Sequence, residues 1–372
     1  MVAGETSGDM LAASLVQGIK RRWSDTKIAG IGGPRMTEQG FDAWWPSEKL
    51  AVRGYVEVLR HYREIVGIRA QLRARLMAQK PELFIGVDAP DFNLDLEQDL
   101  KANGIKTMHF ICPSIWAWRP KRIEKIRQSV NHVLCLFPFE VALLAQHGVD
   151  ATYVGHPLAQ LIPVKADRAA ARATLGLADD AQVVAILPGS RQSEIKFLAS
   201  RFFAAMAVIN RTYPAIKFIV PAIPSLRTQI TQAARAAGVL AQVQILEGQS
   251  HSALAACNVC LIASGTATLE AALFKRPMVI AYNMNWLSWQ IMRRQKLQPW
   301  VGLPNILCND FVVPEFLQDA ATPAALADAV MDWLRHPDKL APLQEKFDVL
   351  HAELKRDTTQ LTTDAIQKVL QS

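Results

Sequence analysis

The fold prediction depends on one stretch of sequence, Val259-Cys260-Leu261-Ile262-Ala263-Ser264-Gly265-Thr266-Ala267-Thr268-Leu269-Glu270. Its first residues form an apolar run long enough for a buried strand, and a helical pattern begins directly after the small residues that follow. A strand that passes straight into a helix is the repeating unit of parallel sheets covered by helices on both faces. The stretch therefore predicts an α/β fold.

The small residues at this turn also indicate a chemistry. Ser264, Gly265 and Thr266 would let a diphosphate approach backbone N–H groups, and the positive end of the following helix would favour its charge. Glu270, about a turn further along, could accept hydrogen bonds from ribose hydroxyls. The alternative is a tight turn in which Ser264 or Thr266 only caps the helix.

The same alternation of short apolar runs and helical patterns continues on both sides of this stretch. In the second half we expect strands over 183–187, 217–220, 243–246, 259–263 and 278–281. In the first half we expect strands over 27–30, 83–87, 107–111, 132–136 and 152–154, with helices over 10–22, 62–79 and 95–103. The pattern predicts two doubly wound, Rossmann-like domains that face a central cleft, where ligands of parallel sheets bind.

A chain of 372 residues exceeds what one core usually supports, because domains tend to split beyond roughly 250 to 300 residues. We place the boundary at Gly155-His156-Pro157-Leu158, where Pro157 ends a regular segment. We expect an N-terminal domain over 1–157, a second domain over 158–345, and a helical segment over 346–372 that packs back on the first domain or on a partner subunit. Residues 4–9 resemble the loop after a first strand, so that strand is either a stub or truncated.

Composition and charge exclude several classes of protein. Half of the residues are apolar and a fifth are charged, which is typical of globular proteins and not of disordered chains. The odd set of five cysteines does not suggest a disulfide framework, and neither a secretory signal nor an apolar run of about 18 residues is visible. The cytoplasm is the expected location. A net charge of +7 and a pI near 9.2 favour anionic partners: lipid headgroups, phosphorylated substrates or nucleic acid.

A second loop with phosphate-binding character is Leu187-Pro188-Gly189-Ser190-Arg191-Gln192-Ser193-Glu194, which also follows an apolar run. Arg191 can hold phosphate oxygens in a planar, two-pronged manner, as a departing pyrophosphate requires. Alone the motif is weak. Together with the turn at 264–270 it predicts a nucleotide-diphosphate site in the second domain.

The first domain offers a candidate base in Phe84-Ile85-Gly86-Val87-Asp88-Ala89-Pro90-Asp91-Phe92-Asn93. A strand that ends in Asp88 places a carboxylate at the cleft, where a general base is useful. The alternative for Asp88 is a loop or helix-capping aspartate. The segment Gly4 to Asp9 could form a polar cradle or merely cap a helix, and His132 and His156 are more often structural than catalytic.

No metal site or cofactor is predicted. A metal-dependent transferase would normally present two aspartates separated by one residue after a strand, to hold a divalent ion on the diphosphate. Asp95 and Glu97 come nearest to this pattern, but they fall in a helical pattern and are expected to face solvent. The segment Gly4 to Asp9 differs from the dinucleotide fingerprint, which disfavours a nicotinamide enzyme.

Seven segments, taken together, resemble one family from nearly end to end. They are Gly4 to Asp9, Gly86 to Asn93, Pro113-Ser114-Ile115-Trp116-Ala117-Trp118-Arg119, Gly155-His156-Pro157, Leu187 to Arg191, Ser264 to Glu270 and Leu303-Pro304-Asn305. In this order they resemble the lipid-A-disaccharide synthases, and the tryptophan segment is especially specific. Relative to the family the start of this sequence lacks about ten residues, which form most of the first strand.

The resemblance implies a GT-B fold and an inverting transfer to a β(1→6) disaccharide. It implies UDP-2,3-diacylglucosamine as donor and 2,3-diacylglucosamine 1-phosphate, an acylated glucosamine phosphate, as acceptor. Asp88 matches the family's essential acid, and Arg191 and Asn305 match residues that contact UDP. Further substrate-binding candidates within the resembling motifs are Glu5, Ser7, Asp91, Trp118, Arg119 and His156.

Acylated sugars would require apolar surface beside a membrane. Segment 62–80 carries isoleucines and leucines along one side with arginines interspersed, and segment 286–294 is both aromatic and basic. Such mixtures suit the bilayer interface, here the inner leaflet of the inner membrane, although either helix could instead pack on its own sheet. A homodimer is left open.

Two rival functions share some of these features. A UDP-N-acetylglucosamine 2-epimerase would have the same architecture and UDP site without a lipid surface. A noncatalytic nucleotide-binding or RNA-binding module would explain the basic charge, but it would not explain Asp88 beside two phosphate loops. No stacking aromatic motif for RNA is evident, so nucleic acid is not an expected partner.

Overall fold

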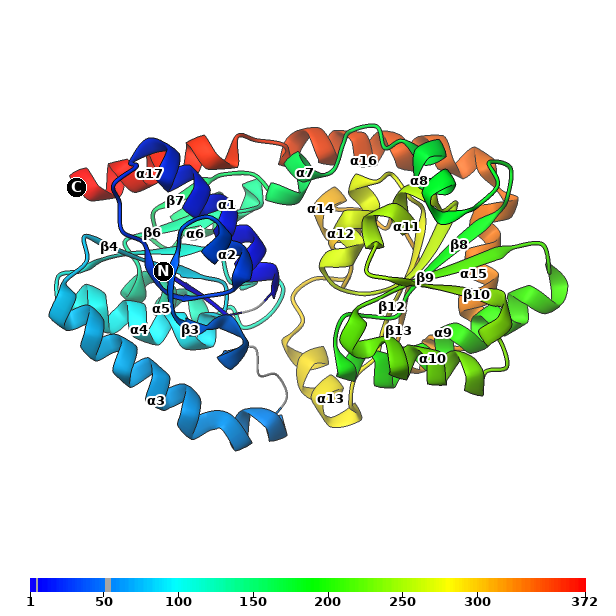
Figure 1. Cartoon of the computed structure of the whole chain (residues 1–372), viewed down its shortest axis with the longest axis horizontal. Coiled ribbons are helices and arrows are strands. Elements are labelled where there is room, and N and C mark those ends of the chain that lie inside the picture. Colours follow the sequence, from blue (N-terminus) through cyan, green and yellow to red (C-terminus); the bar gives the residue numbers. More distant parts are fainter. Residues whose placement is uncertain (5, 51–54) are drawn as a thin grey trace. The chain divides into compact units, whose positions relative to one another are not determined.

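The computed structural model describes residues 1–4, 6–50 and 55–372 and divides the chain into two compact units. Unit 1 comprises Met1–Gln160 together with Leu354–Ser372, and unit 2 comprises Leu161–Glu353. Each unit contains one parallel sheet with helices on both faces (Figure 1). The predicted class, two doubly wound α/β domains, is confirmed.

The sheet of unit 1 has the order β3-β2-β1-β4-β5-β6-β7, with every neighbouring pair parallel. The strands are β1 (Val2–Ala3), β2 (Ala29–Gly32), β3 (Asp42–Pro46), β4 (Leu83–Val87), β5 (Lys106–Phe110), β6 (His132–Cys135) and β7 (Ala151–Tyr153). The central position of β1 explains why its two residues suffice: Val2 pairs with Ile31 on one side and Gly86 on the other. The first strand therefore has two residues, as short as the sequence indicated.

Helices cover both faces of this sheet. They are α1 (Thr6–Arg22), α2 (Pro34–Glu38), α3 (Tyr55–Gln79), α4 (Pro90–Ala102), α5 (Arg122–Ser129), α6 (Pro138–Ala145) and α17 (Thr358–Gln371). One core lies under α1 and α17, where Leu15 and Ile19 pack with Ile366 and Val369. A second lies under α3 and α4. The terminal helix α17 thus returns to unit 1 and lies along α1 (Figure 1).

The sheet of unit 2 has the order β10-β9-β8-β11-β12-β13, also entirely parallel. Its strands are β8 (Val183–Leu187), β9 (Lys217–Ala222), β10 (Val243–Glu247), β11 (Val259–Ala263), β12 (Met278–Tyr282) and β13 (Glu315–Leu317). Its helices are α8 (Arg168–Leu175), α9 (Gln192–Thr212), α10 (Arg227–Ala236), α11 (Ser250–Ala256), α12 (Thr266–Leu273), α13 (Trp286–Gln295), α14 (Leu303–Cys308), α15 (Pro323–Arg335) and α16 (Leu340–Leu354), while α7 (Pro157–Leu161) lies at the boundary of the units.

The prediction that Glu97 faces solvent is wrong. Its side chain is fully buried beside that of His109, whereas the neighbouring Asp95 is partly exposed and pairs with Arg69 and Lys125. The reason is helical phase: Glu97 lies on α4 one turn after the buried Asn93 and one residue after the buried Leu96. Of the edge strands, β3 and β13 were not predicted, because each contains only two or three consecutive apolar residues.

Candidate functional site

Two predicted phosphate loops meet at one edge of the sheet of unit 2. The strands β8 and β11 are direct neighbours in a parallel sheet, with Ile262 opposite Leu187. The turns that follow them, 188–191 and 264–266, therefore leave the sheet side by side at its carboxyl edge. In open α/β sheets this edge is where ligands bind.

The turn after β11 exposes small groups next to a helix start. Gly265 and Thr266 are exposed and Ser264 is half-buried. The hydroxyl of Thr268 donates to the carbonyl oxygen of Gly265 at 2.8 Å, which ties the turn to the first turn of α12. The turn at 265–266 is thus exposed and joined to α12 by a hydrogen bond, an arrangement that suits a cradle for an anion.

Glu270 lies on α12 just beyond this turn and is largely shielded from solvent. Its carboxylate oxygen Oε2 is 3.7 Å from Nε2 of His251. Burial raises the pKa of Glu270 to about 7 and lowers the pKa of His251. A carboxyl group whose pKa is raised to about 7 and which lies beside an exposed turn is typical of a functional site.

A half-buried carboxylate, Glu315, organises the segment that follows α13. Its two oxygens accept hydrogen bonds from the backbone N–H groups of Val301 and Gly302, each at 2.8 Å. The carbonyl oxygen of Val301 accepts from the Ser264 hydroxyl at 3.0 Å. Ser264 is therefore linked through Val301 to Glu315, a residue that the sequence analysis did not select.

Asn305 belongs to the same network and is fully buried. Its amide nitrogen donates to Val313 O and to Glu315, both at 2.8 Å, and its amide oxygen accepts from the N–H groups of Val312 and Val313 at 2.9 and 3.0 Å. All four hydrogen-bonding positions of the amide are thus occupied within the protein. In this arrangement Asn305 shapes the segment 301–315, and its predicted contact with UDP stays a prediction.

Arg191 lies at the start of α9, on the other phosphate loop. Its guanidinium pairs with Glu194 Oε1 at 2.8 Å, and its side chain is 44% exposed. Glu194 also accepts from the backbone N–H of Ser190 at 2.7 Å. A side chain at Gly189 would collide with Glu194, and the positive φ of +130° at Gly189 also favours glycine. Glu194 thus holds both the loop and its arginine.

In unit 1 the candidate base Asp88 follows the last residue of β4. It adopts a left-handed backbone conformation, with φ of +51°, and so does Ala89, with φ of +44°. The backbone N–H of Asp88 donates to Phe110 O at 3.0 Å, and the amide of Asn93 donates to Asp88 O at 2.8 Å. Consecutive left-handed residues other than glycine are strained, and such strain concentrates at functional sites.

The predicted residues Asp91, Trp118 and Arg119 are gathered near one another. Asp91 forms ion pairs with Arg122 and, at 3.8 Å, with Arg119. The guanidinium of Arg119 lies 4.2 Å from the centre of the Trp118 ring. Trp118 is 37% exposed, so this cluster is accessible to a substrate.

Trp116 belongs to the tryptophan segment but is not among the predicted site residues. Its indole N–H donates to Glu140 at 2.9 Å, and its ring packs edge-on against Phe137 and Phe139. Burial raises the pKa of Glu140 to about 7.

The remaining candidates are either held in structural contacts or lie outside the described residues. His156 is buried, its Nδ1 accepts from the N–H of Leu158 at 3.2 Å, and burial lowers its pKa to about 4, so the ring is neutral. Asp9 caps α2 by accepting from the N–H groups of Gly33, Arg35 and Met36. Glu5 and the side chain of Ser7 lie outside the described residues.

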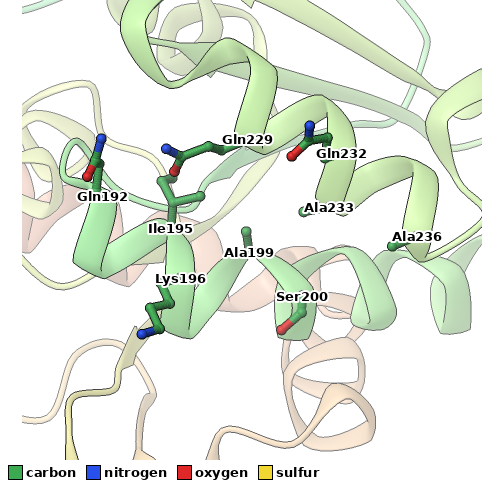
Figure 2. Close-up of a pocket in the computed structure, with 9 residues that line it drawn as sticks. All are labelled: Gln192, Ile195, Lys196, Ala199, Ser200, Gln229, Gln232, Ala233 and Ala236. Atoms are coloured by element: carbon green, nitrogen blue, oxygen red, sulfur yellow. The ribbon is translucent and has the colours of Figure 1, made fainter.

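The described residues form no metal-binding cluster, and the cavity between α9 and α10 is not lined by predicted site residues. Within 1–4, 6–50 and 55–372, no group of three or more His, Cys, Asp or Glu side chains could hold a metal ion. A cavity of about 550 Å³ lies between α9 and α10 (Figure 2). Its lining, which includes Gln192, Lys196 and Gln229, contains none of the predicted site residues.

Comparison with known proteins decides the family. Residues 1–369 match the model of the lipid-A-disaccharide synthetase family. The chain belongs to this family. It is 69% identical to the lipid-A-disaccharide synthase of Albidiferax ferrireducens over 376 aligned positions, which cover 100% of this chain and 97% of that protein. As a member of the lipid-A-disaccharide synthases, the chain is a glycosyltransferase of lipid A biosynthesis, and the two rival functions are set aside.

Solved structures show the same fold at low identity. A glycosyltransferase from Rickettsia africae matches with a TM-score of 0.58 at 9% identity, covering 99% of this chain and 97% of that one. The UDP-N-acetylglucosamine 2-epimerase from Neisseria meningitidis, solved with UDP-GlcNAc, matches with a TM-score of 0.64 at 11% identity, covering 96% and 97%. These matches confirm the GT-B type of architecture, and family membership separates this chain from the epimerases.

The raised pKa of Glu270 predicts a pH-dependent stability. Between the ordinary carboxyl pKa near 4.3 and about 7, the folded protein keeps a proton that the unfolded chain has released, so stability falls as pH rises through this window. Glu270→Gln removes this effect and should stabilise the protein at pH 8, by at most on the order of 3 kcal/mol, with a smaller difference at pH 4.5. Melting temperatures at the two pH values measure it.

The exposed Glu247 of β10 provides the control, because Glu247→Gln should leave the pH dependence of melting as it is. Wild type and Glu270→Gln melting with the same pH dependence would contradict a buried, near-neutral carboxyl at position 270.

Proposed function

We propose that this glycosyltransferase joins UDP-2,3-diacylglucosamine to 2,3-diacylglucosamine 1-phosphate, with inversion at the donor anomeric carbon and release of UDP. The observation that carries the proposal is Asp88, a carboxylate at the carboxyl end of β4 in a strained turn held by backbone and side-chain hydrogen bonds. Family membership supports the substrates, and the neighbour solved with UDP-GlcNAc supports a UDP-sugar donor.

The reaction is a single displacement. The carboxylate of Asp88 takes the proton of the acceptor 6-hydroxyl, and that oxygen forms a bond to the donor anomeric carbon. The bond from this carbon to the diphosphate oxygen breaks, and its electron pair leaves with UDP. The transition state is oxocarbenium-like, as in glycoside hydrolysis.

Charge that develops on the departing diphosphate requires fixed positive groups. Arg191 and the exposed residues Gly265 and Thr266 follow neighbouring strands of unit 2, and the guanidinium and the backbone N–H groups would supply them. Glu270, near the same turn, would accept hydrogen bonds from the ribose hydroxyls of UDP. No protein-bound metal has a part in this mechanism.

Removing the carboxylate by Asp88→Asn should reduce turnover by about 10²- to 10⁴-fold while UDP affinity stays within a factor of two, because general-base catalysis contributes about this much. The assay incubates both acylated sugars with the enzyme and detects the tetraacyl disaccharide 1-phosphate by mass. Disaccharide formation by the wild type tests the proposed reaction itself. Near-normal turnover by the variant would remove Asp88 from the role of base.

Replacing the arginine by Arg191→Ala should weaken UDP binding by roughly 1.5 to 3 kcal/mol, the worth of a charge-assisted contact. Calorimetry in buffer with EDTA measures the affinity without a divalent ion. The matched control is Arg211→Ala, which removes an exposed arginine from the other end of α9 and should leave the affinity unchanged. Equal affinities for Arg191→Ala and wild type would contradict the contact.

We further propose that α13 is the segment that meets the lipid surface. Trp286 is 72% exposed and Ile291 is 47% exposed, and Arg293 and Arg294 follow in the last turn. Segment 62–80 is a weaker candidate, because Ile68, Leu72 and Leu76 are buried in the core of unit 1 and Arg69 and Arg73 form ion pairs with α4. No helix of the described chain is long and apolar enough to cross a bilayer.

The protein should therefore sediment with vesicles of anionic phospholipid at low salt and be partly released at high salt, since each arginine near such a surface adds about 1 kcal/mol. The double change Trp286→Ser and Ile291→Ser should lower the fraction that resists salt. Val349→Ser, which removes an exposed apolar residue from α16, is the control. Undiminished binding of the double variant would exclude α13.

A further inference from the structure

The backbone of Asp88 is held from two directions. On one side its N–H donates to the carbonyl oxygen of Phe110, at the end of β5. On the other its carbonyl oxygen accepts from the side-chain amide of Asn93, in the first turn of α4. The position of the base thus depends on how β5 and α4 are fixed relative to each other.

A fully buried acid–base pair connects α4 and β5. Glu97 lies on α4 one helical turn after Asn93, and His109 lies on β5 immediately before Phe110. The His109 Nδ1 is 2.8 Å from Glu97 Oε1, and both side chains are 0% exposed. Burial raises the pKa of Glu97, while the nearby His109 opposes that shift.

The sequence makes room for this arrangement at Gly86. Gly86 and His109 are partners in the register of β4 and β5, so the histidine lies beside the glycine. A Cβ at position 86 would collide with Glu97 Oε1 and approach the Asn93 side chain to 2.9 Å. Asn93 and Glu97 therefore fill the space that Gly86 leaves open, one above the other against β4.

Burying these three polar side chains lowers the stability of the folded protein. Within the described residues, Asn93 Oδ1, Glu97 Oε2 and His109 Nε2 are buried without a hydrogen-bond partner. Leaving a buried polar atom unsatisfied costs about 1 to 3 kcal/mol, whereas apolar side chains of similar volume would pack here at no such cost. In addition, two consecutive residues, Asp88 and Ala89, have left-handed backbone conformations.

We propose that Asn93 and the buried Glu97–His109 pair are positioning residues for Asp88. Asn93 holds the carbonyl oxygen of Asp88 and so stabilises the left-handed turn that directs its carboxylate. The Glu97–His109 hydrogen bond locks α4 to β5, which fixes Asn93 and Phe110 relative to each other. The inference rests on the proposed role of Asp88 as base and names the residues through which the fold delivers that role.

The test compares buried polar groups near to and far from Asp88. Asn93→Leu removes the amide at nearly constant volume and should lower kcat about ten- to hundredfold, because small misplacements of a reacting group cost this much. The KM for the UDP-sugar should change less than twofold, since the predicted donor residues belong to unit 2. Glu97→Leu should lower kcat in the same way, whereas Glu97→Gln, which keeps an acceptor for His109, should stay within threefold of wild type.

Thr107→Val is the matched control. Thr107 is buried on the same strand as His109, and its hydroxyl donates to Ser129 O at 2.9 Å, away from Asp88. This change should lower the melting temperature while kcat of the folded protein remains that of the wild type. If Asn93→Leu does not fold, Asn93→Ala replaces it, because alanine removes the donor to Asp88 O without adding volume.

A rescue separates positioning from general destabilisation. Ala89→Gly removes the penalty that an L-residue pays in a left-handed conformation. In the Asn93→Leu background it should recover at least threefold in kcat if Asn93 stabilises the turn. Wild-type kcat in Asn93→Leu, an equal loss of kcat in Thr107→Val, or no recovery with Ala89→Gly would overturn the inference. Asp88→Asn run in parallel shows whether the base assignment fails instead.

Discussion

Carboxylates packed directly against glycines fix the loops on which the candidate site depends. Asp9 lies against Gly33, Glu97 against Gly86, Glu194 against Gly189 and Glu315 against Gly302, and in each pair a Cβ on the glycine would collide with the acidic side chain or approach it within 3 Å. Three of these carboxylates accept hydrogen bonds from backbone N–H groups of the loop or helix start beside the glycine. Without the glycine the carboxylate could not come close enough to accept them.

This arrangement suits a glycosyltransferase because catalysis of sugar transfer relies on groups fixed before the reaction begins. Glu194 holds the loop of Arg191, and Glu315 holds the segment to which Ser264 donates. Preorganised dipoles cost no reorganisation at the moment when charge develops on the departing diphosphate. The partial burial of Glu194 and Glu315 is offset by the hydrogen bonds that these two carboxylates accept.

The sequence predicted the strands well and these pairs not at all, for a physical reason. The apolar runs at 83–87, 183–187 and 259–263 coincide with β4, β8 and β11, because strands buried on both faces must be continuously apolar. Gly33 and Asp9 are 24 residues apart in sequence, and Glu315 is 13 residues beyond Gly302, so no local pattern joins them. Glu315 begins a short edge strand, which lacks the apolar run that would have revealed it.

Glu97 is a different case, since a signal was present. Asn93, Leu96, Glu97 and Leu100 follow the spacing of one helical face, and Leu96 and Leu100 are apolar. The phase therefore placed Glu97 in the buried stripe. Because glutamate is a charged residue, it was expected to face solvent. Its buried partner, His109, becomes visible only in the register of β4 and β5, which places His109 beside Gly86.

Three residues of unit 1 with left-handed backbone conformations directly follow strands at the carboxyl edge of its sheet. Asp88 and Ala89 follow β4, and Ile111, with φ of +80°, follows β5. A β-branched residue in this region is a strong outlier, and it is held by a hydrogen bond from its N–H to Leu134 O at 3.0 Å. Such conformations persist only where the surroundings over-determine them. At Asp88 those surroundings are Phe110 O and the Asn93 amide, so the residue proposed as base lies where the fold spends stability to hold its backbone.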